Sequence, residues 1–357
     1  MKKSKKFVLA GLALLAAIIM VLLPLAGCKT DVDTSSPEQE QPGDSNTNSS
    51  GGGDTVNGNN DNDASVITTS DPAAFIDGIT AAGTYTLVAT NECTDTVAIK
   101  EALWALASRL PGTRIHLDLG QSGITSIGYS AFEGCSSLAS VTFAEGSRLD
   151  IIGGVAFRGC TSLVSVEIPS LVTSIGYSAF EGCSSLASVT FAEGSRLGMI
   201  GDAAFRGCTS LVSVEIPTSV TSIEEAAFSR CSSLASVEIP SSVTRIWNSA
   251  FGGCSSLASV TFAEGSRLGM IGDDAFNGCR SLVSVEIPSS VTSIGNSAFG
   301  GCLKLSTVKV EAETPPALGT NVFFTHLDLK IQVPRSSEGY YTSAENWSAY
   351  KIEAITP

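Results

Sequence analysis

Ten cysteines and two histidines are the residues of this 357-residue sequence best suited to chemistry. Eight of the cysteines end a recurring Ala-Phe-x-Gly-Cys phrase or a variant of it, at a shorter or a slightly longer regular interval: Cys135, Cys160, Cys183, Cys208, Cys231, Cys254, Cys279 and Cys302. On adjacent turns of a stack, equivalent cysteines would lie ~4.8 Å apart with parallel side chains, whereas a disulfide needs converging Cβ atoms. A metal site needs ligands that close on one point, and no Cys-x-x-Cys is present. We therefore expect a buried column of thiols that fill space, with Cys93 buried outside it.

Cys28 is the one cysteine whose surroundings indicate a covalent modification. It follows a basic start, an apolar run over residues 7–23 and the triplet Leu25-Ala26-Gly27, which together are typical of a signal peptide with a lipobox. A plain transmembrane helix is the alternative, but the apolar run is slightly short for a span of ~20 residues. We expect residues 1–27 to be removed and the thiolate of Cys28 to take diacylglycerol. The mature chain would then be held stably at a membrane by several acyl chains.

The remaining candidates for catalysis are weak. His116 and His326 belong to no zinc-binding or triad pattern, and the sequence contains no Gly-x-Ser-x-Gly, phosphate-binding loop or dinucleotide fingerprint. Carboxylates recur with the repeat rather than as one constellation, which weakens the case for a special acid or base. We expect no enzyme, no cofactor and no metal site. Only a histidine beside carboxylates in a pocket would revive the enzymatic hypothesis.

The elements that position these residues come from the repeat itself. After each cysteine of the column, the pattern Leu-x-x-Val-x-Ile/Phe turns three apolar side chains inward from a short strand, as at Leu211, Val214 and Ile216. Both intervals lie in the range of leucine-rich repeats, whose strands are stable only when stacked as a parallel sheet. Two return paths alternate. One begins Ile-Pro, and the other, Phe-Ala-Glu-Gly-Ser-Arg, is two residues longer.

The sequence therefore predicts an α/β repeat fold, a leucine-rich-repeat solenoid with a parallel sheet on one face and irregular or short helical arcs on the other. Residues 28–63 are expected to form a disordered polar tether behind the lipidated cysteine. Residues 64–120 are expected to form an N-terminal α/β cap, with a strand over 84–89, a helix over 96–110 and the first strand of the sheet at 115–119. Repeats follow over 121–310. A C-terminal cap over 311–357 should bury Tyr341, Trp347 and Tyr350 rather than offer them to a ligand.

These residues resemble the BspA-like leucine-rich repeats of bacterial surface proteins, whose unit reads Leu-x-x-Ile-x-Ile-Pro-x-x-Val-x-x-Ile-Gly-x-x-Ala-Phe-x-x-Cys. The match extends over about residues 124 to 310. The Ile-Gly step fails at Glu224 and Trp247, and the asparagine ladder of animal and plant repeats is missing. The resemblance implies an adhesin-like, lipid-anchored surface protein whose partner is a protein or an extracellular-matrix ligand. It implies display on the outside of the bacterial outer membrane.

The net charge and the pattern of surface residues limit the classes of partner further. A formal net charge of −14 at pH 7 disfavours nucleic acid and anionic lipid heads, so the lipid on Cys28 would be the only link to a membrane. The outward positions of the concave sheet form the candidate binding face: Ser165, Glu167, Ser188, Thr190, Ser213, Glu215, Ser236, Glu238, Ser259, Thr261, Ser284 and Glu286.

This candidate face offers none of the Trp, Tyr or Arg anchors of tight interfaces. A solvated surface without a partner therefore stays open beside a binding face. A ligand would be long or repetitive and held by many weak contacts. The alternative to an adhesin-like role is a non-catalytic structural or spacer protein of the envelope that faces the periplasm.

Overall fold

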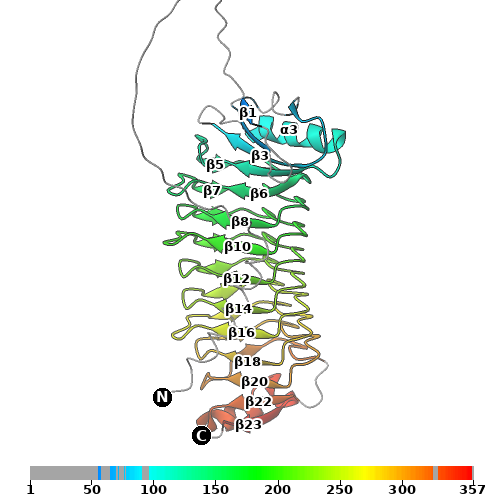
Figure 1. Ribbon diagram of the computed structural model, residues 1–357. Helices are drawn as coiled ribbons and strands as arrows, with labels where there is room; N and C mark the ends of the chain where they lie inside the picture. The colour runs from blue at the N-terminus through cyan, green and yellow to red at the C-terminus, as the bar shows by residue number, and fades with distance from the viewer. Residues whose placement is uncertain are drawn as a thin grey trace, which may run out of the picture. The chain divides into compact units, whose positions relative to one another are not determined.

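The computed structural model describes residues 55–57, 65–69, 71, 76, 78–90, 96–324 and 329–355. In these residues the chain winds into stacked turns whose strands form two sheets (Figure 1). The stack confirms the predicted solenoid. The predicted leader, Cys28, Cys93 and His326 lie outside the described residues. Within the described part, no helix is long and apolar enough to cross a membrane.

The larger sheet has fourteen strands, and its spatial order follows the order of the chain. Its strands are β1 (Thr55–Asn57), β2 (Ser65–Thr69), β3 (Thr84–Ala89), β4 (Arg114–Asp118), β6 (Leu138–Thr142), β8 (Ser165–Ile168), β10 (Ser188–Phe191), β12 (Ser213–Glu215), β14 (Ser236–Ile239), β16 (Ser259–Phe262), β18 (Ser284–Ile287), β20 (Thr307–Val310), β22 (Lys330–Val333) and β23 (Lys351–Ala354). β1 is antiparallel to β2, and every later pair is parallel.

A second parallel sheet runs along the other side of the turns, where the sequence predicted irregular or short helical arcs. It has nine strands of two residues each. They are β5 (Ser126–Ile127), β7 (Ile151–Ile152), β9 (Ser174–Ile175), β11 (Met199–Ile200), β13 (Ser222–Ile223), β15 (Arg245–Ile246), β17 (Met270–Ile271), β19 (Ser293–Ile294) and β21 (Ala317–Leu318). The second residue of each strand is buried, so the Ile of the Ile-Gly step anchors this side of the core.

The register of the large sheet does not change between the shorter and the longer repeats. Val166, Val189 and Val214 lie opposite one another on successive strands, and all three are buried. The difference in length falls in the loops between the two sheets. Five residues separate β8 from β9, and seven separate β10 from β11. The longer loops therefore add surface without disturbing the core.

A column of stacked phenylalanines fills the centre of the turns. Neighbouring ring centroids are 5.1 to 5.6 Å apart from Phe132 to Phe323, within the range of offset-stacked aromatic pairs. At the C-terminal end Phe323 meets Tyr350 edge-on at 5.3 Å and lies 6.3 Å from Trp347. Each ring between the two ends thus has a ring on both sides, so one substitution affects two interfaces.

The N-terminal elements extend the large sheet beyond the strand expected to begin it. The predicted helix is α3 (Thr96–Arg109), which buries Ile99, Leu103 and Leu106. It connects β3 to β4 as a crossover, so β3 pairs parallel to β4, and β2 and β1 follow. The strand over 115–119 is therefore the fourth of the sheet. β1 lies inside the segment predicted to be a tether, where Val56 pairs with Ile67.

The C-terminal elements bury the aromatic residues singled out in the sequence. After β22 come a short 3-10 helix η1 (Arg335–Ser337), α4 (Glu338–Ser343) and η2 (Trp347–Ala349). Tyr341 and Trp347 are fully buried, and their polar ends are satisfied, since they donate to the carbonyls of Ala312 at 2.8 Å and Pro316 at 2.7 Å. Tyr350 is partly buried. The boundaries of both predicted caps stay predictions.

A ladder of Asp and Asn side-chain oxygens, which the sequence analysis did not predict, follows the Ile-Gly step. Asp202, Asn248, Asp273 and Asn296 each accept a hydrogen bond from the backbone N–H at the equivalent position of the next turn, at 2.6 to 3.2 Å. The first three turns carry Tyr129, Gly154 and Tyr177 at this position. The ladder therefore supports only the later turns.

The glycine of the Ile-Gly step is required because successive turns approach closely there. A Cβ on Gly176 would lie 2.5 Å from the backbone N of Gly154, closer than real Cβ contacts. Gly128 occupies the same local sequence on an earlier turn, and a Cβ there would meet nothing within 4 Å. At the two departures, Glu224 and Trp247, the backbone N–H still donates to the Ile carbonyl of the preceding turn, at 3.2 and 3.0 Å.

Replacing Phe205 by Ala should lower the free energy of unfolding by about 3 to 5 kcal/mol, because it leaves a cavity between two stacked rings. Phe324→Ala is the matched control, since that side chain is 64% exposed. Urea unfolding followed by circular dichroism measures both. Equal stability of the two variants would contradict a column of stacked rings that holds the turns together.

Gly176→Ala should destabilise the protein by about 1 to 3 kcal/mol, because the new methyl group forces two turns apart. Gly128→Ala has the same flanking residues and free space, so it should leave stability unchanged or raise it by about 0.4 to 1 kcal/mol through the unfolded chain. Thermal unfolding of the pair tests this. A larger loss at Gly128 would contradict the assigned close approach.

Candidate binding surfaces

The outer face of the fourteen-stranded sheet carries all twelve residues of the candidate binding face, and each is exposed. We call this surface the sheet face. Its serines lie opposite one another from strand to strand, as at Ser165, Ser188 and Ser213. A second column runs beside them, in which Glu215 lies opposite Glu238 and Glu238 opposite Thr261. The structure thus brings these residues together as two continuous rows rather than as a closed pocket.

Charge on the sheet face changes sign along the stack. From β6 to β18 the charged residues of the two columns are all glutamates, whereas β20, β22 and β23 add Lys309, Lys330 and Lys351 together with Glu353, which pairs with Lys351. Lys309 donates to Glu286 and, at 3.3 Å, to Glu311. The hydrogen bond from Lys309 lowers the pKa of Glu286. The unpaired carboxylates therefore belong to the N-terminal and central turns.

A hollow of about 780 Å³ lies at the edge of the sheet face over β6, β8 and β10. Two longer loops border it, through residues 143–147 and 192–193, and the shorter loop at Pro169 and Ser170 lies between them. The two extra residues of each longer loop thus raise the walls of the hollow. A second hollow of about 460 Å³ lies beyond the second longer loop, beside Glu215 and Pro217.

His116 lies on β4, opposite Ser140 on β6. Its Nδ1 lies 2.6 Å from the hydroxyl of Ser140, and burial, reinforced by the charge of Arg114, lowers its pKa. Asp118 on the same strand instead accepts from the backbone N–H of Gly120 at 2.7 Å. No group of three or more His, Cys, Asp or Glu side chains in the described ranges is placed to hold a metal ion.

The eight repeat cysteines form the predicted column of free, buried thiols. From Cys160 onward, each sulfur donates to the carbonyl of the phenylalanine of the preceding turn at 3.0 to 3.3 Å. Burial raises the pKa of Cys254 and Cys302 to about 12. These thiols stay protonated at neutral pH and act as structural fillers with one weak donor each.

An exposed aromatic pair on the first turns was missed, because aromatic anchors were sought only on the sheet face. Tyr129 is 68% exposed and Tyr177 52%, and their ring centroids lie 6.2 Å apart although a whole turn separates them. The turn between them carries Gly154, whose absent side chain leaves room for the ring of Tyr177. The signal in the sequence is the Tyr that follows Ile-Gly on these two turns only.

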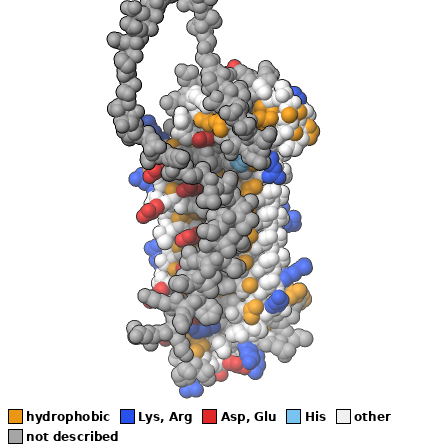
Figure 2. Space-filling model, viewed as in Figure 1, with side chains coloured by type: hydrophobic (Ala, Val, Ile, Leu, Met, Phe, Trp, Pro, Cys, Tyr) orange, Lys and Arg blue, Asp and Glu red, His pale blue; other side chains and the backbone are white. Residues whose placement is uncertain are grey.

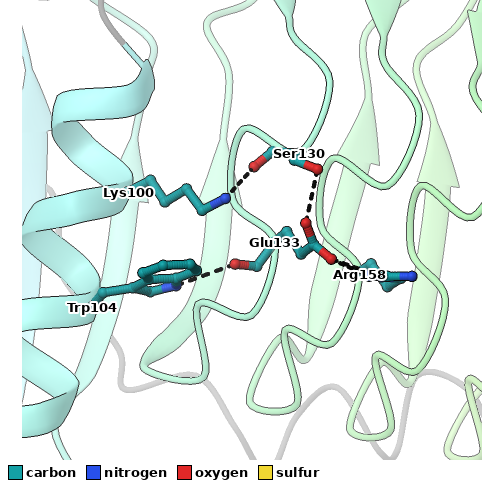
Figure 3. A network of polar contacts seen from close by, with 5 residues as sticks. All are labelled: Lys100, Trp104, Ser130, Glu133 and Arg158. Carbon is teal, nitrogen blue, oxygen red and sulfur yellow. Dashed lines mark hydrogen bonds and ion pairs between the residues drawn. The ribbon is translucent and has the colours of Figure 1, made fainter.

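A polar network beside this pair connects α3 to the first two turns (Figure 3). Lys100 donates to the carbonyl of Ser130 at 2.7 Å, and Trp104 to that of Glu133 at 3.2 Å. The Glu133 carboxylate accepts from the Ser130 hydroxyl at 2.8 Å and pairs with Arg158. These hydrogen bonds lower the pKa of Glu133. The network fixes the orientation of the helix on the repeats.

In the space-filling view, the visible surface of the repeats is mostly white, that is, backbone and small neutral side chains (Figure 2). Charged side chains are spread along the edges, and apolar ones gather near the N-terminal elements (Figure 2). Val97 and Trp104 of α3 are exposed.

The repeats match a family model described as the BspA type leucine rich repeat region, in six copies over residues 115–197, 194–306 and 256–343. The chain belongs to this family, as its repeat unit indicated. Leucine-rich-repeat solenoids are typically non-catalytic binding scaffolds.

Several solved structures are similar to the chain. A leucine-rich repeat protein of T. pallidum is 25% identical, with 71% of this chain and 87% of that one covered and a TM-score of 0.41. A leucine-rich repeat protein of Bacteroides ovatus is 21% identical, with coverage of 85% and 98% and a TM-score of 0.34. The pneumococcal vaccine antigen PcpA is 18% identical, with coverage of 68% and 79% and a TM-score of 0.34. No curated protein matches the chain.

Proposed function

We propose that this chain is a non-catalytic, lipid-anchored protein of the bacterial envelope that binds other proteins through its repeats. The observation that carries the proposal is the sheet face, where eight repeat strands in one register expose two unbroken rows of side chains. Membership of the BspA-type family supports it, since members of this family are bacterial surface proteins. A broad, regular surface of this kind favours a protein ligand over a small molecule.

The contact surface in this proposal is the candidate binding face, centred on Glu215 and Glu238. These two carboxylates lie opposite each other on adjacent strands, where like charges repel. A ligand that brings positive charge between them relieves that repulsion. Because each exposed contact is weak, affinity comes from many contacts along an extended or repetitive partner.

Anchoring and location complete the proposal. The lipid on Cys28 holds the chain at the outer membrane, facing outward, and the partner is a surface protein or an extracellular-matrix protein. The net charge of −14 argues against nucleic acid as a partner. The role is adhesin-like.

A structural or spacer protein facing the periplasm is the second candidate. The small, nearly uniform side chains of the sheet face favour it, because tight interfaces usually depend on aromatic or Arg anchors. In that case the repeats set a distance within the envelope and bind neighbours weakly or not at all.

Capture of partners by the mature chain tests the binding role. The protein is immobilised through its C-terminus and exposed to envelope proteins and host-matrix proteins. Glu215→Lys with Glu238→Lys should reduce the captured partner at least about tenfold, since it reverses the charge at the centre of the face. Glu224→Lys with Glu225→Lys, an adjacent acidic pair beside the second sheet, is the matched control. Capture that is equal in both double variants would exclude the sheet face as the contact surface.

Treatment of intact cells with a protease tests location. An outward-facing solenoid should be degraded while a periplasmic marker survives, and Cys28→Ala should release the protein from the membrane fraction because it removes the acylated thiol. Complete protection of the solenoid in intact cells would contradict outward display and favour the spacer hypothesis.

A further inference from the structure

Each of the seven repeat turns from β6 to β18 places one carboxylate on or beside the sheet face. Turns with the shorter loop carry it on the strand, and turns with the longer loop carry Thr there and Glu three residues later on the loop. All seven are exposed: Glu145, Glu167, Glu193, Glu215, Glu238, Glu264 and Glu286. Successive carboxylates of this array are therefore one turn, ~4.8 Å, apart along the stack. Some lie on the strand and the others on the loop that follows it.

The larger hollow collects three of these carboxylates. Glu145, Glu167 and Glu193 come from three successive turns, and no Lys or Arg lines the hollow with them. None of the three has an ion-pair partner among the residues that the structure describes. Arg148 and Arg196, on the same longer loops, are not among its lining residues. The hollow is thus a concentration of negative charge that the described part of the chain does not neutralise.

The arrangement selects against a single bound ion. The three carboxylates are not close enough to count as a shared metal site in the described ranges, and about 780 Å³ is far more space than one cation fills. The strands beneath the hollow add hydroxyls from Ser140, Ser165 and Ser188. Small hydroxyl side chains allow a peptide backbone to approach the sheet and exchange hydrogen bonds with the hydroxyls. Spaced charges with hydroxyls between them fit an extended chain that carries several cations.

We propose that this hollow binds an extended basic peptide segment of a partner protein, whose Lys or Arg side chains pair with Glu145, Glu167 and Glu193. This inference rests on the proposed protein-binding function and names its partner class. Charge complementarity carries it, because the array attracts a polycation from a distance and the hollow fixes where it docks. The alternation of shorter and longer repeats then has a role, since the longer loops build the walls. Because the carboxylates are exposed, binding weakens with salt.

The test uses the mature chain and a synthetic peptide of four Lys-Ser repeats, titrated by isothermal calorimetry at about 20 mM and about 150 mM salt. We expect saturable 1:1 binding that is weaker at the higher salt concentration. The triple variant Glu145→Gln, Glu167→Gln, Glu193→Gln should bind about tenfold more weakly, from the loss of three exposed ion pairs. A peptide of four Glu-Ser repeats should not bind.

The matched control removes the same charge from the second sheet, with Asp202→Asn, Glu225→Gln and Asp273→Asn. Asn already serves the ladder at Asn248 and Asn296, so these changes preserve its hydrogen bonds. Circular dichroism and thermal unfolding confirm that both triple variants fold. An equal loss of affinity in the two variants would show attraction by net charge alone and overturn the assignment of the hollow. Wild-type protein that does not bind the Lys-Ser peptide would also overturn it.

Failure of this inference is distinguishable from failure of the proposed function. If the mature chain captures a partner that depends on Glu215 and Glu238 but does not bind the basic peptide, the protein-binding function stands and the hollow is not the basic-peptide site. If the peptide binds in the hollow but no protein is captured from either source, the partner class proposed for the chain in vivo is wrong.

Discussion

The structure depends on one constraint: whatever side chain a turn carries must tolerate a similar side chain one strand spacing away. Phenylalanine meets it as an offset stack of rings 5.1 to 5.6 Å apart, and cysteine meets it as a small filler that donates to the turn before. Glycine meets it where backbones touch, as at Gly176. Side chains of like charge cannot repeat on every turn without repelling one another, so the sequence places charged residues differently.

Side chains of like charge are kept apart along the stack in two ways. At the position after Ala-Phe, the first four turns alternate Glu133, Arg158, Glu181 and Arg206, which pair along the stack. On the sheet face the carboxylate instead moves between strand and loop as the repeat length changes. Glu215 and Glu238 are the exception, since two shorter repeats follow each other and bring two glutamates face to face. The surface charge is thus arranged by the same rule that arranges the core.

Periodicity was sufficient to predict the solenoid, the strand that follows each repeat cysteine and the thiol column, because each depends on residues at one fixed spacing. The features that were missed depend on what lies one turn away. Tyr129 and Tyr177 meet only because Gly154 lies between them, and the hollow exists only because a shorter loop separates two longer ones. β1 was missed because Val56 is the only apolar residue of its three-residue strand. The assignment of the sheet face as a binding surface stays a prediction, since its geometry shows exposure and not a ligand.

The thiol column has a consequence for how the chain reaches its folded state. The proposed export would bring the polypeptide into a compartment where oxidants join free thiols, and in the unfolded chain nothing holds the eight sulfurs apart. In the folded chain each of the eight sulfurs is buried within its own turn. Folding of the turns therefore competes with oxidation of the thiols. A disulfide formed before folding would link turns whose native geometry does not allow that bond. Each thiol that becomes buried as its turn stacks on a neighbour would be removed from that competition.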